Sequence, residues 1–303
     1  MDTINAHPMD GFPVRPLRFA LSDQKRDFVW SRTNPRFALF FNAFVLHVPY
    51  FEHYLVKSMR AAMPHVDDPQ LLRDMRAIVG QEANHAKVFV EYYASMKQHY
   101  PKVPALCDYN DRYYTKKAKT DTLKQLVGYT AGYETFTFLA GAIILQNYNK
   151  WLVDSDPTIK AMFVWHQVEE VEHGAVAFEV YQKLFGDCEW YRRWMIVVTV
   201  THMVRETYKA YTHMARVEGW MSNPVKAVKS LASCTGLLLR FVWHALPVLR
   251  KGYHPRKHPL VTRQQNPIQI AWRRYEKAGG DVLEIDRAKM AEIMKLAPES
   301  IAA

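Results

Sequence analysis

Hydrophobic residues recur every three to four positions from about residue 36 to residue 250. This spacing places apolar side chains on one face of a helix. The pattern predicts helices over about 36–63, 70–100, 121–148, 157–185, 190–217 and 225–250, with a short one over 287–296. Pro49 predicts a kink or a boundary inside the first helix, and Asp121 is the expected N-cap of the third. Residues 101–121, with two prolines and a lysine cluster, are expected to form a connection. The alternation typical of strands is not evident, so the chain is expected to be all-α.

Composition divides the chain into three parts. Residues 1–35 contain four prolines and predict an irregular N-terminal arm, residues 36–186 a four-helix bundle, and residues 187–303 a basic helical extension packed on the bundle. With 49% hydrophobic residues, the chain can bury a sizeable core. Its three cysteines lie far apart, which suits a reducing compartment. We detect no signal peptide and no run of about 18 uncharged apolar residues, so we expect a cytoplasmic protein.

Four glutamates occupy the middle of apolar helix faces, where a charge is costly unless it is paired. They are Glu52, Glu82, Glu134 and Glu170. Two of them have a histidine three residues later, His85 after Glu82 and His173 after Glu170. Residues at this spacing lie one above the other on a helix, so each pair can present a carboxylate and an imidazole to one point.

The order of these residues along the chain strengthens the prediction of a metal site. It runs Glu, Glu-x-x-His, Glu, Glu-x-x-His on four successive helices, and helical bundles hold two metal ions with such a set. Two divalent metals would neutralise four carboxylates. We expect two iron ions, with manganese as an alternative, because carboxylate and imidazole ligands suit both metals. The predicted division gives Glu52, Glu82 and His85 to one metal and Glu134, Glu170 and His173 to the other, with Glu82 and Glu170 as bridges.

Three further residues have candidate roles near this site. His166 lies one turn before Glu170 and is either an extra ligand or a donor to a carboxylate. Glu169 is expected to orient His85 or His173. Thr137, one turn after Glu134, is a candidate for handling protons, although a bond to its own helix backbone is the simpler expectation.

The chain resembles the ferritin-like diiron carboxylate superfamily over residues 36–185, on the repeated pattern of a Glu followed by an acid-Glu-x-x-His. The second copy, Glu169-Glu170-Val171-Glu172-His173, matches fully, whereas the first has Gln81 where an acid is common. The segments at 48–52, 81–85 and 166–173 also resemble the predicted metal-dependent hydrolases, a family that includes nonheme diiron hydroxylases. The resemblance implies a ferritin-like four-helix bundle with additional C-terminal helices, and it supports the metal site more firmly than the reaction.

The basic residues are concentrated in one segment. Residues 191–275 contain 15 Lys and Arg against two Glu, within a chain whose formal net charge is +10. Tryptophan and tyrosine beside arginine and lysine suit a membrane interface, although ordinary helices covering the bundle explain them as well. We therefore consider peripheral contact with the inner face of a membrane through 191–275, and we expect no binding to nucleic acid because no recognised motif accompanies the charge.

The leading functional hypothesis is a nonheme diiron oxidoreductase, an O2-dependent monooxygenase that hydroxylates an apolar or lipid-like substrate. Its electrons would come from an external ferredoxin or reductase, because the chain has no nucleotide-binding or flavin motif such as GxGxxG. The alternative is a metal-dependent hydrolase that uses a dimetal-activated water. Iron storage or a purely structural metal site is a third hypothesis, which the length of the basic extension disfavours.

Overall fold

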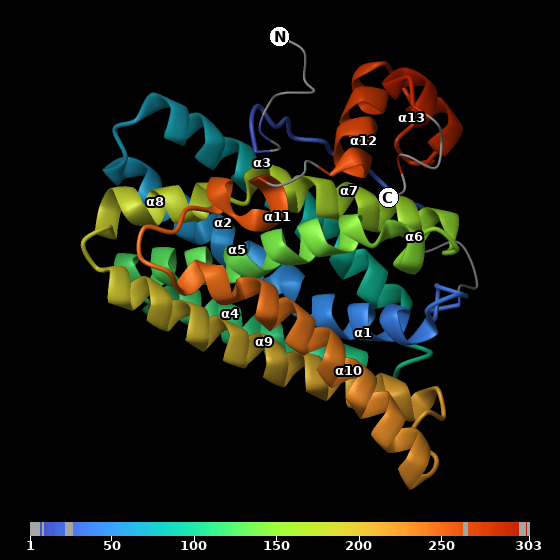
Figure 1. The fold of residues 1–303 in the computed structure, drawn as a ribbon. Coiled ribbons are helices and arrows are strands. Elements are labelled where there is room, and N and C mark those ends of the chain that lie inside the picture. Colours follow the sequence, from blue (N-terminus) through green and yellow to red (C-terminus); the bar gives the residue numbers. More distant parts are fainter. Residues whose placement is uncertain (1–6, 8, 22–26, 263–265, 297–300, 302–303) are drawn as a thin grey trace.

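The computed structural model describes residues 7, 9–21, 27–262, 266–296 and 301. Within them the chain forms thirteen α-helices and three 3-10 helices, and an isolated bridge between Ser31 and Ser155 is the one β-type pairing (Figure 1). The predicted all-α class is confirmed. Parts of the predicted N-terminal arm (1–6, 8 and 22–26) and of the C-terminal extension (263–265, 297–300 and 302–303) lie outside the described residues.

Four helices carry the predicted ligands, and each packs against its neighbours. They are α2 (Val48–Ala62), α3 (Pro69–Ser95), α5 (Leu123–Gln146) and α7 (Pro157–His173). Helix α2 contacts α3 and α5, and α7 contacts α5 and α3, so the four surround a common core. Helix α1 (Pro35–Val45) precedes α2, and their separation just before Pro49 agrees with the predicted boundary. The predicted fourth helix is divided into α7 and α8 (Val176–Phe185).

Local sequence explains where these helices begin. The Asp68 side chain accepts hydrogen bonds from the amides of Gln70 and Leu71 at the start of α3. Thr122 and Gln125 form a capping box at the start of α5, so the N-cap is Thr122 and the prediction of Asp121 was wrong by one residue. An Asp121 side-chain oxygen instead accepts from the Tyr54 hydroxyl at 2.6 Å.

The expected connection over 101–121 is a further correction. Residues Val103–Thr120 form the helix α4, which packs mainly on α2. Pro104 lies in its first turn, where the missing N–H of a proline removes no helical hydrogen bond. Most of its side chains face solvent, and the buried ones are Val103, Asn110 and Tyr114. An amphipathic pattern this sparse is easily mistaken for a loop.

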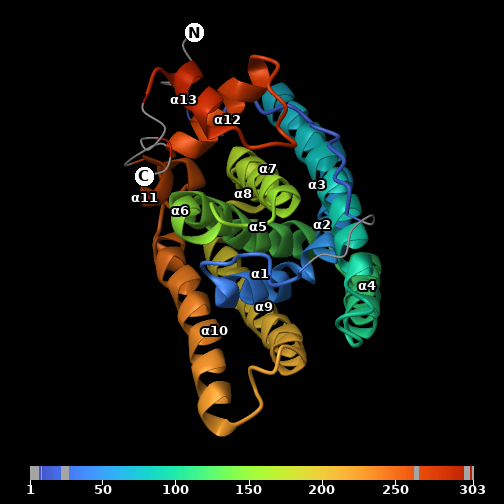
Figure 2. The same cartoon turned by 90° about the vertical axis from the view of Figure 1, so that its right-hand side faces the viewer.

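The C-terminal part consists of two long helices and several short ones. Helix α9 (Glu189–Val217) packs on α5 and α1, and α10 (Pro224–Ala245) returns along the same side of the bundle (Figure 2). The remaining elements are α6 (Tyr148–Trp151), η1 (Met63–His65), η2 (Leu246–Leu249), η3 (Pro255–Lys257), α11 (Pro259–Thr262), α12 (Pro267–Lys277) and α13 (Arg287–Met294). Figure 1 shows α12 and α13 above α7, on the side of the bundle away from α10.

Candidate metal centre

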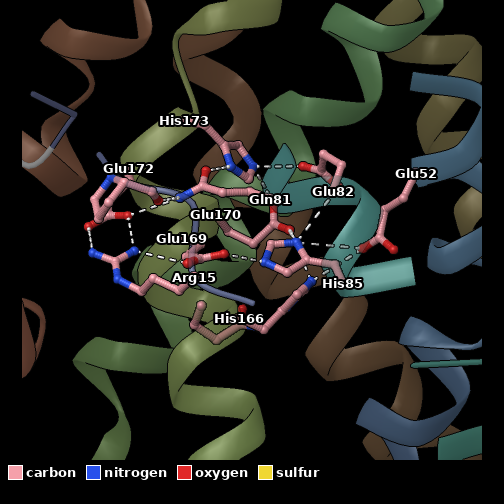
Figure 3. A network of polar contacts seen from close by, with 12 residues as sticks. Arg15, Glu52, Gln81, Glu82, His85, His166, Glu169, Glu170, Glu172 and His173 are labelled. Atoms are coloured by element: carbon pink, nitrogen blue, oxygen red, sulfur yellow. Dashed lines mark hydrogen bonds and ion pairs between the residues drawn. The ribbon is translucent and has the colours of Figure 1, made fainter. Parts of the chain in front are cut away.

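Seven glutamate and histidine side chains from α2, α3, α5 and α7 converge in the core between these helices (Figure 3). All are buried, and the most exposed of them, His166, is only 3% exposed. The set comprises Glu52, Glu82, His85, Glu134, His166, Glu170 and His173. All six predicted ligands, and the candidate extra ligand His166, therefore lie together. Their role as ligands stays a prediction.

The first of two donor groups contains Glu52, His85, His166 and Glu170, whose ligand atoms lie within 4.8 Å of one another. The Nε2 atom of His166 is 3.0 Å from Glu170 Oε1 and 3.5 Å from Glu52 Oε1. The Nδ1 atom of His85 is 3.6 Å from the same Glu170 oxygen. Such separations leave room for one cation bound by all four residues, since donors at about 2 Å from a metal lie about 3 Å apart.

The second donor group contains Glu82, Glu134, Glu170 and His173. The Nε2 atom of His173 is 3.0 Å from Glu82 Oε1, 3.3 Å from Glu134 Oε2 and 3.4 Å from Glu170 Oε2. This group has one histidine where the first group has two, so the two positions are chemically unequal.

Two carboxylates lie between the groups. Glu170 directs Oε1 to His166 and His85 and Oε2 to His173. Glu82 directs Oε1 to His173, and its Oε2 is 3.7 Å from His85 Nδ1. Each of these carboxylates thus presents one oxygen to each group, which is the placement a bridging ligand requires. The grouping differs from the predicted division in Glu82, which lies with Glu134, Glu170 and His173 rather than with Glu52 and His85.

The inward-facing atoms have no hydrogen-bond partner among the described residues. These atoms are both carboxylate oxygens of Glu52, Glu82 and Glu170, Oε2 of Glu134, Nδ1 of His85, and Nε2 of His166 and His173. Buried polar atoms are nearly always satisfied, so such a cluster calls for a common partner. Divalent cations fit this donor set of carboxylate oxygens and imidazole nitrogens.

Burial and mutual repulsion of the carboxylates also shift their pKa values. Burial raises the pKa of Glu52 to about 7 and that of Glu134 to about 8, and in both cases the charge of Glu82 adds to the increase. Burial opposes ionisation of Glu170 too, but the charges of His166 and His173 hold its pKa well below the ordinary value. Burial thus opposes the charged form of these carboxylates, and a bound cation would favour it.

The backbone of α5 approaches α7 closely beside this site, and Gly141 makes the approach possible. A Cβ atom at position 141 would lie 2.9 Å from the Gln167 carbonyl oxygen and 3.2 Å from Glu170 Cβ. The absence of a side chain thus brings Glu134 and Glu170, on facing helices, within reach of one cation.

A second layer of polar residues holds the outer nitrogens of the ligand histidines. Glu169 accepts from His85 Nε2 at 2.9 Å, and Gln81 Oε1 accepts from His173 Nδ1 at the same distance. Of the two partners predicted for Glu169, the contact is with His85. Gln81 supplies this acceptor through its side-chain amide oxygen. These bonds direct the opposite ring nitrogens to the site and fix each ring's tautomer.

Arg15, in the N-terminal arm, joins both of these contacts (Figure 3). It donates to Glu169 at 2.9 Å and, through two nitrogens at 2.7 and 3.0 Å, to Glu172. Glu172 in turn accepts from Gln81 at 3.3 Å. One guanidinium thereby connects to His85 through Glu169 and to His173 through Glu172 and Gln81. Arg15 and Glu172 were not predicted from the sequence as parts of this site. For Glu172 the sequence did contain a signal, because Glu169, Glu170 and Glu172 place three acids within four residues of one apolar helix.

Thr137 contacts the predicted ligand on its own helix. Its hydroxyl lies 3.3 Å from both the backbone oxygen and the Oε1 atom of Glu134. The expected bond to the helix backbone and a contact with a candidate ligand thus occur together. The role of Thr137 in catalysis stays a prediction.

Comparison with known proteins identifies the family. The family model described as predicted metal-dependent hydrolase matches residues 13–259, and the chain belongs to this family. The match covers all seven residues of the centre as well as Arg15. No curated protein matches the chain significantly. No solved structure matches it either, so membership of the ferritin-like superfamily stays a prediction.

Proposed function

We propose that the chain is an enzyme whose seven converging glutamates and histidines would hold two metal ions. The observation that carries this proposal is the set of buried, unpartnered donor atoms divided into two groups that share Glu170. A single metal would leave donors of one group unsatisfied, whereas two metals would give every inward-facing atom a partner.

We propose that the metals are iron and that the reaction is O2-dependent hydroxylation of an apolar substrate, with an external electron donor. Support comes from the donor set: four carboxylates and three imidazoles suit iron in two oxidation states, with manganese as the alternative. When bound, an iron pair supplies reductive activation of O2 and insertion of one oxygen atom into a C–H bond.

The residues of the chain have separate tasks in this reaction. Glu170 and Glu82, which present one oxygen to each donor group, would help to hold both metals. Glu169 and Gln81 hold His85 and His173 in one orientation. Thr137 holds a proton on its hydroxyl, 3.3 Å from Glu134 Oε1. Phe89 and Trp165 pack edge-on against ligand histidines, with ring centroids 4.6 and 4.8 Å away, and exclude water from that side.

Metal-dependent hydrolysis is the second candidate, and the description of the family favours it. The same centre would bind two redox-inactive cations, and a metal-activated water would attack an ester or phosphate. The family description gives no support to an oxidoreductase, which rests on the donor set alone. Both candidates require the same seven residues.

The test begins with the metal content of protein purified from iron-replete cells. We expect about two irons per chain, with both lost in Glu170→Ala and neither lost in Glu91→Ala, which removes an exposed glutamate of α3. Anaerobic reduction followed by O2 should then consume O2 and change the iron absorption bands. Bound zinc or manganese with turnover of an ester or phosphate substrate would select hydrolysis. Failure to bind any metal would refute both candidates.

A further inference from the structure

Helix α10 has two apolar faces, and only one is packed. Ser230, Cys234, Leu238, Phe241 and Ala245 are buried. Phe241 stacks on Phe40 and Phe44 of α1, with centroids 6.0 and 5.4 Å away. The opposite face, continued into η2, forms what we call the outer stripe: Val225, Val228, Ala232, Gly236, Leu239 and Trp243 of α10, and Leu246 and Leu249 of η2.

The outer stripe is open to solvent along its whole length. Residues spaced by three or four positions share one helix face, and every member of this stripe is exposed and uncharged. Val228 is 67% exposed, Leu239 62% and Trp243 70%. Ten of the fifteen exposed large hydrophobic residues in the described chain belong to residues 190–249, so the exposure is concentrated rather than scattered. A contiguous apolar face of this kind marks an interaction surface.

Exposed tryptophans extend this surface to the start of α9. Trp190 is 68% exposed and Trp194 is 53% exposed. The Arg192 side chain, between them in sequence, donates to the backbone oxygen of Val248 at 2.9 Å. This bond joins the start of α9 to η2, so Trp190 and Trp194 of α9 lie near the end of α10 that carries Trp243. Tryptophan is the residue most typical of the lipid–water boundary.

Basic side chains flank the apolar stripe. Lys226 and Lys229 follow its first residue, and Arg250 and Lys251 follow its last. A surface cavity of about 670 Å³ adjoins the beginning of α10. Its basic lining residues are Arg36, Lys150, Lys226, Lys229 and Arg240, and its one acidic lining residue is Glu218. Five basic side chains against one carboxylate make the lining of this cavity positive.

We propose that the outer stripe docks on the surface of a bilayer that contains anionic lipid, with α10 lying in the interface and the basic cavity facing lipid phosphates. Charge selects this occupant, because a second copy would bring the same basic segment against itself. Residues Pro224–Leu249 are long and apolar enough to cross a membrane by length and composition, with mean hydropathy 1.3. The inner face of α10 is packed on the bundle, however, so lipid cannot surround the helix, and it lies on the membrane instead.

This docking is independent of the reaction at the metal centre. It extends the contact predicted over residues 191–275 to a defined surface. It also requires no conformational change, because the stripe is already exposed.

The test is flotation of the full-length purified protein with vesicles of phosphatidylcholine alone and of phosphatidylcholine with 30% phosphatidylglycerol. We expect binding to the anionic vesicles and far weaker binding to the neutral ones. Replacing Lys226 and Lys229 by Gln should weaken binding about twenty-five-fold, at about fivefold per basic side chain. Leu239→Gln with Trp243→Gln should weaken it tenfold or more. The matched control is Val90→Gln with Leu283→Gln, since both residues are 40% exposed on other parts of the surface.

Several results would overturn the proposal. The proposal is wrong if the wild-type protein binds neither kind of vesicle or binds both equally well. It is also wrong if salt and alkaline carbonate fail to extract the bound protein, because that behaviour indicates a membrane-spanning helix. The proposal also fails if the Leu239→Gln, Trp243→Gln variant binds vesicles as well as the control variant does. It fails likewise if light scattering shows a dimer that this variant abolishes while vesicle binding is retained. Circular dichroism of each variant establishes that the fold is intact, which we expect because the replaced side chains face solvent.

Discussion

Replacing Arg15 by Met tests whether the N-terminal arm orients the metal ligands. Arg15 is only 4% exposed, and it contacts Glu169, Glu172 and Glu276 at 2.6 to 3.0 Å. Burial disfavours the charge on Arg15, but the hydrogen bonds and charges of these carboxylates raise its pKa above the ordinary value. The guanidinium is therefore charged at every pH at which the protein is folded.

The cost of removing it follows from which partners remain. Loss of one member of a buried ion pair typically destabilises by about 3–5 kcal/mol, because a charge is left uncompensated. Here Glu172 keeps Arg273 Nε at 3.0 Å and Glu169 keeps His85 Nε2 at 2.9 Å. We therefore expect a loss near the lower limit, about 3 kcal/mol of unfolding free energy. Metal affinity should fall by about ten- to a hundredfold, because the partners that orient two ligand histidines lose their anchor.

Two measurements on the same variants separate these effects. Urea denaturation of metal-free protein gives the stability, and competition with a chromophoric chelator gives the metal affinity. Arg18→Met is the control, because Arg18 is an exposed residue of the same arm. Arg15→Lys should restore part of the stability but little of the affinity, since an ammonium lacks the fork that contacts both carboxylates. A stability loss with unchanged metal affinity would refute the orienting role and leave Arg15 as a link between the arm and α12.

Three other predictions concern separate parts of the fold. His166→Phe should weaken one metal position at least tenfold and spare the other, seen as a two-phase metal titration, because His166 belongs only to the first group. Gly141→Ala should destabilise by about 1–3 kcal/mol through overpacking, whereas Gly236→Ala, with nothing within 4 Å of its added Cβ, should stabilise by about 0.5–1 kcal/mol; thermal denaturation measures both. Burial lowers the pKa of His258 to about 4. Unfolded histidine binds protons below about pH 6.5, so this residue should remove about 3 kcal/mol of stability as the pH falls towards 4. His258→Asn should show a shallower loss in acid denaturation at fixed metal content.

Residues of the centre were predictable because a buried charge conflicts with a helical apolar pattern. Glu134, for example, interrupts the apolar face of a helix whose residues Leu126 to Leu145 are all buried. Such a conflict can be recognised within a few helical turns of the sequence. The histidines three residues after two of the glutamates explain it, because carboxylates and imidazoles together can bind a metal ion. The division of these residues into two donor groups was harder to predict from the sequence. It depends on how α7 faces both α3 and α5, which no local pattern encodes.

Arg15 could not be predicted for a different physical reason. Its partners Glu169, Glu172 and Glu276 lie 154, 157 and 261 positions further along the chain. The arm has no helical period that would identify an inward side chain, and a lone arginine among prolines is ordinary at a surface. The missed helix α4 illustrates the same limit, because few of its side chains are buried and the prolines before it and in its first turn suggest a loop.

The burial of so many acids links the metal centre to the proposed membrane surface. Seven of the described glutamates are buried (Glu52, Glu82, Glu134, Glu169, Glu170, Glu172 and Glu206), against two buried arginines, Arg15 and Arg192. These buried acids do not lie among the surface charges, and two divalent cations would neutralise four of the carboxylates. The outer surface is consequently more basic than the formal net charge of +10. Because its acids are buried around the metal centre, the protein has an excess of basic side chains on its surface. Helix α10 adds an apolar face beside these basic side chains, and a bilayer with anionic lipid can bind both.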